Sequence, residues 1–154
     1  MKNNYINIYN NLINLTRNKS LYENLNSEET FSSRLTFYLF HFAFFLKVYK
    51  NEDKDLLQDI YDYNFRQLEI SIREIGYGDV SINKKMKDYL NLFHKILIEI
   101  ENWDELNNHL KGQFFIKYIN ENSNSAFFVN YFDNYFNNLK KNTLNSFINN
   151  ILDL

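Results

Sequence analysis

Three histidines are the side chains with the clearest potential for chemistry, because imidazole can bind a metal or transfer a proton near neutral pH. They are His41, His94 and His109, and they fall in three separate predicted helices. None belongs to an HExxH pair, and no acidic residue has the spacing that would complete a metal site beside them. The absence of cysteine excludes disulfides, thiolate metal sites and thiol catalysis. We therefore expect no metal and no cofactor.

His41 stands out among the histidines because it lies in an apolar segment, seven residues after Arg34 and on the same helical face. We interpret it as a histidine at the edge of the core, with its ring nitrogens held by hydrogen bonds. Arg34 must reach water or pair with a carboxylate, for which Glu69 and Glu74 are the candidates. An enzyme that uses Arg34, His41 and Glu74 is the alternative. Since no nucleophile–base spacing supports it, we expect a protein that is not an enzyme.

The stretch from Ile72 to Val80 separates two long helical patterns and holds two of the three glycines, Gly76 and Gly78, of a chain without proline. A glycine just beyond a helix can adopt the left-handed conformation that ends it, so the first helix is predicted to stop at Gly76. Asp79 or Ser81 is expected to cap the second. A nucleotide site would need a longer glycine-rich run after a strand. The stretch therefore predicts a tight corner between two helices.

Lys84 and Lys85, followed by Lys87, lie early in the second of these helices. A solvated helix face is the favoured interpretation, and contact with anionic lipid headgroups or RNA phosphate is the alternative. The chain has 17 basic and 19 acidic residues and a net charge of −2. This charge gives no electrostatic footprint for nucleic acid, so no specific nucleic-acid partner is expected.

Apolar residues recur at helical spacing through most of the chain, and no stretch alternates as a strand would. The pattern predicts an all-α fold, with one compact domain of about six helices over residues 1–154. The helices are expected over residues 1–16, 31–50, 56–75, 79–100, 103–118 and 126–154. The last range can hold one helix or two with a break near Asn142, and residues 17–30 read as irregular.

The segment 31–50 is apolar around its whole circumference, which is typical of a buried central helix or a membrane span. Between Arg34 and Lys47 the apolar run is about a dozen residues, whereas a bilayer needs roughly 20. Thr36 and His41 also interrupt it. We therefore predict a buried central helix.

The N-terminal residues 1–17 contain asparagines among their apolar positions and lack the features of a signal peptide or an organelle presequence. A cytoplasmic, bacterial protein is the expectation. Aromatic residues make up 18% of the chain. Either some of them form an exposed groove for an apolar partner helix, or they reflect the codon bias of an AT-rich genome.

Two groups of residues resemble a known family. Residues 72–81 (IREIGYGDVS) and 84–87 (KKMK) closely resemble the LREMGVGDLSV-KKMK signature of the ubiquinol-cytochrome c chaperone family, which includes mitochondrial complex III assembly factors and alphaproteobacterial relatives. Residues 21–22, 29–34 and 39–41 (LY, ETFSSR and LFH) resemble its upstream stretch. Ser33 replaces the usual glycine, and residues 94–96 depart from the family's FYGR element after Phe93.

The resemblance covers about residues 21–118, which leaves an N-terminal helix in residues 1–20 and a C-terminal helical extension over 123–154. It implies an all-helical, non-enzymatic chaperone that binds cytochrome b or an early intermediate of ubiquinol-cytochrome c reductase, near the ribosome or peripherally on the inner membrane. A helical adapter with an unrelated soluble partner is the alternative, and the oligomeric state stays open. The residues expected to form either a client-binding face or a structural network are Arg34, His41, Glu69, Arg73, Glu74, Gly76, Gly78, Asp79, Lys84 and Lys85.

Overall fold

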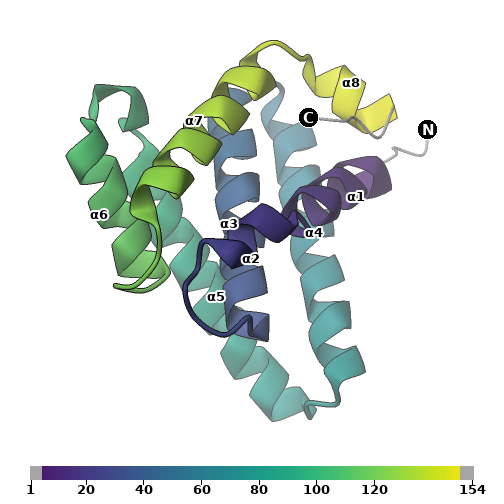
Figure 1. Ribbon diagram of the computed structural model, residues 1–154. Coiled ribbons are helices and arrows are strands. Elements are labelled where there is room, and N and C mark those ends of the chain that lie inside the picture. Colours follow the sequence, from purple (N-terminus) through teal and green to yellow (C-terminus); the bar gives the residue numbers. More distant parts are fainter. Residues whose placement is uncertain (1–4, 150–154) are drawn as a thin grey trace.

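The computed structural model describes residues 5–149, which form eight α-helices, one short 3-10 helix and no strand (Figure 1). The elements are α1 (Tyr5–Thr16), α2 (Lys19–Glu23), α3 (Phe31–Val48), α4 (Lys54–Ile75), α5 (Asp79–Ile100), η1 (Trp103–Glu105), α6 (Asn108–Tyr118), α7 (Ser125–Lys140) and α8 (Leu144–Asn149). The predicted all-α fold is confirmed. The first and last predicted helices also include residues 1–4 and 150–154, which lie outside the described residues.

The described residues hold more helices than the six predicted, and polar side chains explain the extra boundaries. The segment expected to be irregular contains α2, which begins where the Asn18 side chain accepts a hydrogen bond from the Ser20 amide at 3.0 Å. The helix predicted over 103–118 is interrupted before α6, because the Asn107 side chain accepts from the Leu110 amide at 2.9 Å and caps a new helix. The C-terminal stretch breaks beside Asn142, which was one of its two predicted forms.

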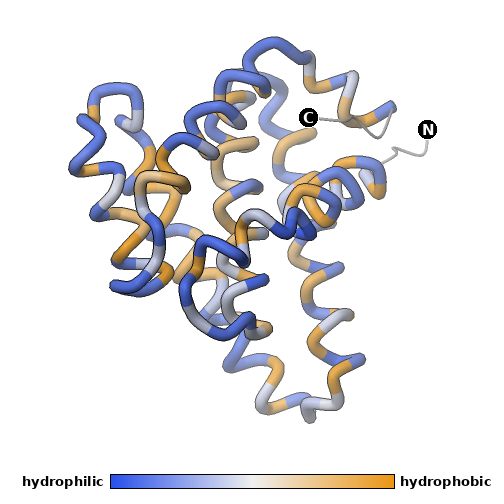
Figure 2. Tube along the Cα trace, in the orientation of Figure 1, coloured by the Kyte–Doolittle hydropathy of each residue, from blue (hydrophilic) through white to orange (hydrophobic). Residues whose placement is uncertain are grey.

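Helix α3 is the buried centre of the molecule, as predicted. Thr30 and Ser33 form a reciprocal capping box at its start, and the eleven side chains from Leu35 to Phe45 are all buried. Helices α1, α5 and α7 pack against it from different sides. Figure 2 shows a largely apolar trace for α3, interrupted at single hydrophilic positions, whereas the traces of α4 and α5 are more strongly striped.

No helix within residues 5–149 has both the length and the apolarity needed to cross a membrane.

Aromatic rings fill the space between α3, α6 and α7. Phe132 of α7 stacks on Phe44 of α3 and on Phe115 of α6, with ring centroids 5.6 and 5.3 Å apart, and meets Phe40 edge-on at 5.5 Å. Offset and edge-to-face arrangements are those that aromatic quadrupoles favour, in addition to the apolar area removed from water. Much of the aromatic content is therefore core material.

Replacing Phe132 with alanine should lower the free energy of unfolding by about 3–5 kcal/mol, because the substitution leaves a cavity among three rings. Chemical denaturation followed by far-UV circular dichroism measures the loss. The control is Ile98→Ala on α5, where the side chain is 71% exposed, and it should change stability by less than about 0.5 kcal/mol. Equal effects of the two substitutions would contradict this account of the core.

Candidate functional site

The corner between α4 and α5 has the predicted left-handed geometry at Gly76, whereas Gly78 is extended. Gly76 has φ +106°, in the left-handed region, and its amide donates to the Arg73 carbonyl at 3.0 Å. Gly78 precedes α5 with φ −76° and ψ 164°, an extended conformation that any residue can adopt. Only Gly76 is therefore required by its backbone conformation.

The prediction that Asp79 or Ser81 caps α5 is wrong, because Gly78 occupies the capping position and no side chain caps the helix. Asp79 is instead the first residue of α5 and accepts a charged hydrogen bond from Arg73 Nη1 at 2.5 Å. Arg73 Nε also lies 3.9 Å from Glu69 Oε2. The hydrogen bond to Asp79 raises the pKa of Arg73. Three of the predicted site residues thus come together and link the two helices on the solvent side.

Most other residues of the corner are exposed. Lys85 Nζ lies over the Tyr77 ring, 4.5 Å from its centroid, whereas Glu74 and Lys84 project into solvent. Helical spacing places Ile75 on the same apolar face as Ile72, but its side chain is 54% exposed while Ile72 is fully buried. The core between α4 and α5 therefore ends at Ile72 and Ile82, and the apolar residues between these two positions face solvent.

The same substitution made at each glycine distinguishes the conformational roles of Gly76 and Gly78. Gly76→Ser should lower the free energy of unfolding by about 1–2 kcal/mol, because a side chain at φ +106° is strained although no atom lies within 4 Å of an added Cβ. Gly78→Ser should be neutral or stabilising, since serine suits the extended capping position before α5. Thermal and urea unfolding measure both variants, and equal losses would refute the assignment.

Both ring nitrogens of His41 are engaged, as interpreted from the sequence, but the residue lies within the core and not at its edge. It is fully buried, with Nδ1 2.6 Å from the Phe37 carbonyl and Nε2 2.7 Å from the Tyr131 hydroxyl. Since a carbonyl can only accept, Nδ1 carries the proton and Nε2 accepts from Tyr131. Burial lowers the pKa of His41 to about 4, although the hydrogen bond to Phe37 opposes the shift. The ring is therefore neutral and joins α3 to α7.

This lowered pKa predicts a loss of stability in acid. Above pH 6.5 the imidazole is neutral in both states, whereas between pH 6.5 and about 4 the unfolded chain binds a proton that the folded chain excludes. The free energy of unfolding should therefore fall as pH falls, by about 1.4 kcal/mol per unit and roughly 3 kcal/mol in all from this group.

Urea unfolding at a series of pH values gives the slope of the unfolding free energy against pH. The difference in this slope between the wild type and His41→Gln measures the contribution of His41. The matched control is His109→Gln, at an exposed position. His109→Gln should retain the wild-type dependence on pH. A wild-type slope in His41→Gln would contradict the assignment.

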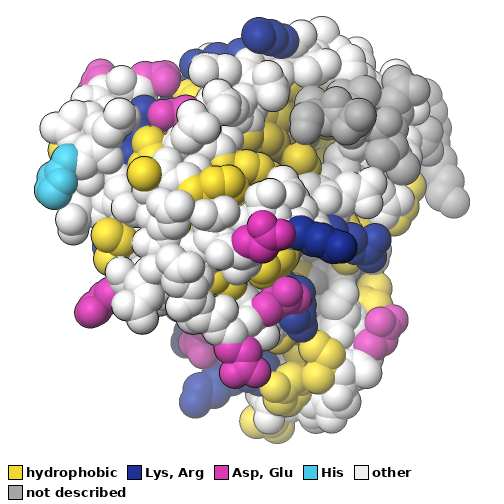
Figure 3. Space-filling model, in the orientation of Figure 1, with side chains coloured by type: hydrophobic (Ala, Val, Ile, Leu, Met, Phe, Trp, Pro, Cys, Tyr) yellow, Lys and Arg dark blue, Asp and Glu magenta, His cyan; other side chains and the backbone are white. Residues whose placement is uncertain are grey.

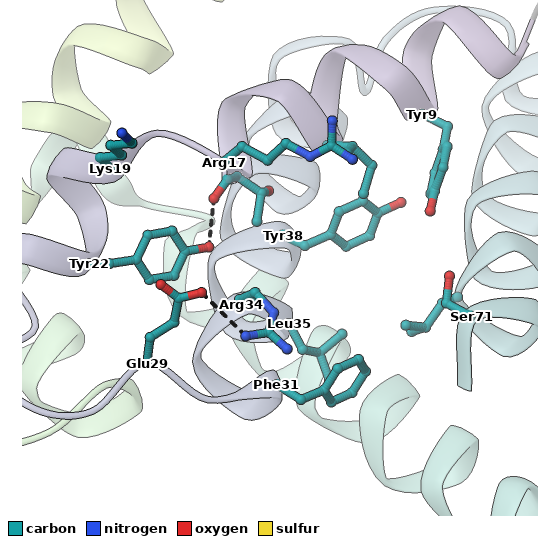
Figure 4. A pocket seen from close by; sticks show the side chains of 13 residues that line it. Tyr9, Arg17, Lys19, Tyr22, Glu29, Phe31, Arg34, Leu35, Tyr38 and Ser71 are labelled. Carbon is teal, nitrogen blue, oxygen red and sulfur yellow. Dashed lines mark hydrogen bonds and ion pairs between the residues drawn. The ribbon is translucent and has the colours of Figure 1, made fainter. Parts of the chain in front are cut away.

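A pocket of about 360 Å³ lies where α1, α3 and α4 meet (Figure 4). We call it the α1–α3–α4 pocket. Its apolar walls are Ile13, Leu35, Leu68 and the Phe31 ring. Its other lining residues are Tyr9, Thr16, Arg17, Lys19, Tyr22, Glu29, Arg34, Tyr38 and Ser71.

The polar atoms deep in the pocket have partners within the protein. The Tyr38 hydroxyl donates to Asn64 Oδ1 at 2.6 Å, and Ser71 donates to the Gln67 carbonyl at 3.0 Å. The Tyr22 hydroxyl donates to the Thr16 carbonyl at 2.6 Å. Burial first, and the charge of Glu29 second, raise the pKa of Tyr22 to about 12. The inner surface therefore offers mainly apolar contact to a ligand.

The mouth of the pocket carries charge. Glu69 and Glu74 were predicted as the partners of Arg34, and this prediction is wrong. Arg34 Nη1 instead lies 3.3 Å from Oε2 of Glu29, which is five residues earlier in the chain. Arg17 and Lys19 also line the pocket and have no ion pair with any described residue. Basic and acidic side chains gather below α1 on the face drawn in Figure 3. One acid against three cations leaves the mouth positive.

The sequence-predicted residues do not form one site. Arg34 lines the α1–α3–α4 pocket, whereas neither His41 nor Glu74 does, so the catalytic arrangement of these three residues is not formed. Within residues 5–149, no group of three or more acidic or histidine side chains is placed to hold a metal ion. Arg17, Tyr9 and Tyr38 were not predicted as site residues. A pattern of helical periodicity shows which residues face inward but not which helices enclose a hollow.

The family comparison covers the part of the chain that contains the corner and α3. The model of the ubiquinol-cytochrome c chaperone family matches residues 23–104, which is more than half of the chain. The chain belongs to this family. The match is shorter than the expected 21–118 and extends from the end of α2 to η1. Comparisons with curated proteins and with solved structures found no match.

Membership of this chaperone family indicates a role in the assembly of complex III, with a protein as client. The matched residues include the predicted site residues from Arg34 to Lys85. Residues of α1 that line the pocket, such as Tyr9 and Ile13, lie outside the match.

Proposed function

We propose that this protein holds newly made cytochrome b, or an early assembly intermediate that contains it, by binding an apolar segment in the α1–α3–α4 pocket. The observation that carries the proposal is an apolar hollow with a positive mouth, in a member of a complex III chaperone family. A membrane protein segment that has not yet reached the bilayer exposes apolar side chains to water, so an apolar pocket lowers its free energy.

The composition of the pocket suits such a segment. Leu35 and Leu68 offer apolar contact, and the hydroxyls of Tyr38 and Ser71 are already satisfied, so a purely apolar side chain can fill the space without leaving a buried donor unpaired. An apolar helix recognised in this way contributes anchors spaced three or four residues apart.

The cations at the mouth favour a particular end of the segment. Arg17 and Lys19 can pair with acidic flanking residues, or with the free carbonyls at the C-terminus of a bound helix. Arg34 can also pair with the client, by exchanging its present partner Glu29 for a client group. Its ion pair with Glu29 is half-exposed and therefore weak. The client is thus proposed to meet the pocket with an apolar segment that ends in an acidic or helix C-terminal group.

The α4–α5 corner is a second candidate for client contact. Arg73, Asp79, Lys84 and Lys85 belong to the family-like signature and are accessible, whereas His41 is buried and acts in the core. We propose a cytoplasmic protein that meets its client beside the ribosome or at the inner membrane surface.

Affinity capture of the full-length protein from detergent-solubilised membranes tests the proposal. The wild type should recover cytochrome b, and two pocket variants should each lower the recovery about tenfold, or about 1.4 kcal/mol. Ser71→Phe fills the hollow, and Arg17→Glu reverses a charge at its mouth. The control is Lys54→Glu, an equal charge change at the exposed start of α4, which should capture normally.

Arg73→Ala and Asp79→Ala, measured in the same assay, test the corner separately. If the wild type captures no complex III subunit, the proposal is wrong. Normal complex III content in a strain that lacks the gene would favour a helical adapter with an unrelated soluble partner.

A further inference from the structure

Asparagine side chains join the loop between α2 and α3 to the loop between α6 and α7, far away in the sequence (Figure 1). Asn124 pairs with Asn24 twice. Its backbone amide donates to the Asn24 carbonyl at 2.8 Å, and its side-chain amide donates to Asn24 Oδ1 at 2.9 Å. The Asn26 side chain donates to the Asn122 carbonyl at 2.8 Å. The two loops are therefore held together by specific polar contacts.

Asn120 adds two further hydrogen bonds between the loops. Its Nδ2 lies 2.9 Å from Ser27 Oγ and 3.3 Å from the Leu25 carbonyl. The Leu25 side chain is buried, which fixes the first loop from the core side as well. Asn26 has φ 56°, a left-handed conformation that asparagine adopts more readily than most residues. We call Asn24, Asn26, Asn120 and Asn124 the asparagine clamp.

The clamp determines where Glu29 lies. The short segment that contains Glu28 and Glu29 runs between two fixed points, the clamp on one side and Thr30 in the capping box of α3 on the other. Of the two acids, only Glu29 lines the α1–α3–α4 pocket. Figure 4 shows its carboxylate at the mouth, paired with Arg34. The register of the loop thus places one negative charge beside the cations of the mouth.

We propose that Glu29 is an internal competitor for the anionic group of the client, and that the asparagine clamp positions it. The inference rests on the proposed function of the α1–α3–α4 pocket and adds how that pocket discriminates among apolar segments. A segment with an acidic group or free helix carbonyls replaces Glu29 on Arg34. A segment without such a group leaves Glu29 in place and meets its carboxylate at the mouth. Glu29 thus makes binding depend on the charge of the client.

Two properties of the structure suit such an exchange. The ion pair of Glu29 with Arg34 is half-exposed, so it is weak and easily replaced. The clamp consists of several hydrogen bonds spread over two loops, so loss of this one ion pair leaves the loop in place. The charge of Glu29 also acts within the mouth, because it adds to burial in raising the pKa of Tyr22, whereas Arg34 opposes the rise.

A thiol placed in the pocket of the full-length protein tests the proposal. The chain has no cysteine and Ser71 lines the pocket, so Ser71→Cys adds a single reactive group there. Its rate of reaction is measured with a dianionic disulfide, dithiobis(nitrobenzoate), and with a neutral one, dithiodipyridine. Both reactions need the same thiolate, so the ratio of the anionic to the neutral rate is independent of the thiolate fraction and reports the charge at the mouth.

Glu29→Gln should raise this ratio about threefold, because it removes the acid that lines the mouth. Asn26→Gly should raise it about twofold, since glycine keeps the left-handed conformation but loses the hydrogen bond to Asn122. In the Glu29→Gln background, Asn26→Gly should have no further effect, because a positioning residue acts through the group that it positions. The matched control is Asn51→Gly, at an exposed position between α3 and α4, and it should leave the ratio unchanged.

An unchanged ratio in Glu29→Gln or in Asn26→Gly would overturn the proposal. An effect of Asn26→Gly that is equally large with and without Glu29 would also overturn it. Loss of stability alone would speed both reactions together and leave the ratio unchanged.

Capture of cytochrome b separates this inference from the proposed function. Glu29→Gln should recover about threefold more cytochrome b than the wild type, since the client no longer has to displace an internal acid. Equal recovery by the two proteins would contradict the competition while leaving the proposed function intact. If the wild type recovers none, the proposed function itself is wrong, whatever the ratio of thiol rates.

Discussion

The burial of α3 on every side is the constraint on which the rest of the structure depends. Eleven consecutive side chains of this helix are buried, so α1, α5 and α7 must each supply an apolar face to it. Two of these side chains, Tyr38 and His41, carry polar groups that would be costly in an apolar interior. Asn64 of α4 and Tyr131 of α7 satisfy them, so the same contacts that remove the penalty also fix which helix lies on which side of α3.

The same constraint explains where the surface features lie. Helices α4 and α5 are longer than α3, and buried positions on their facing sides end at Ile72 and Ile82. Beyond these residues the two helices have no third partner, so the corner closes through Gly76 and an exposed ion pair instead of through a core. The α1–α3–α4 pocket arises in a related way, because α1 passes over α3 and α4 without filling the space between them.

The sequence predicts the parts of this fold that follow from local chemistry. The apolar circumference of α3 and the left-handed glycine at position 76 each depend on one residue or one helix, and both were predicted. The hydrogen bonding of His41 was also predicted, although one of its two partners, Tyr131, comes from α7. The predictions that were wrong depend on partners in other elements or on competing side chains. The pairing of Arg34 with Glu29 depends on the path of the loop before α3, and the exposure of Ile75 depends on where a neighbouring helix ends. Neither is encoded in helical periodicity.

The family match and the pocket overlap only in part, and this difference bears on how a client would be recognised. The matched residues supply α3, α4 and Arg34, whereas Tyr9, Ile13 and Arg17 close the pocket from outside the match. A pocket shared in full by the family would have all of its walls within the matched residues. If the shared helices provide the scaffold and α1 provides the remaining wall, selectivity for a particular apolar segment resides in side chains such as Ile13 and Arg17. These are only partly buried or exposed, so they can change while the buried α1 residues Ile8 and Leu12 stay the same.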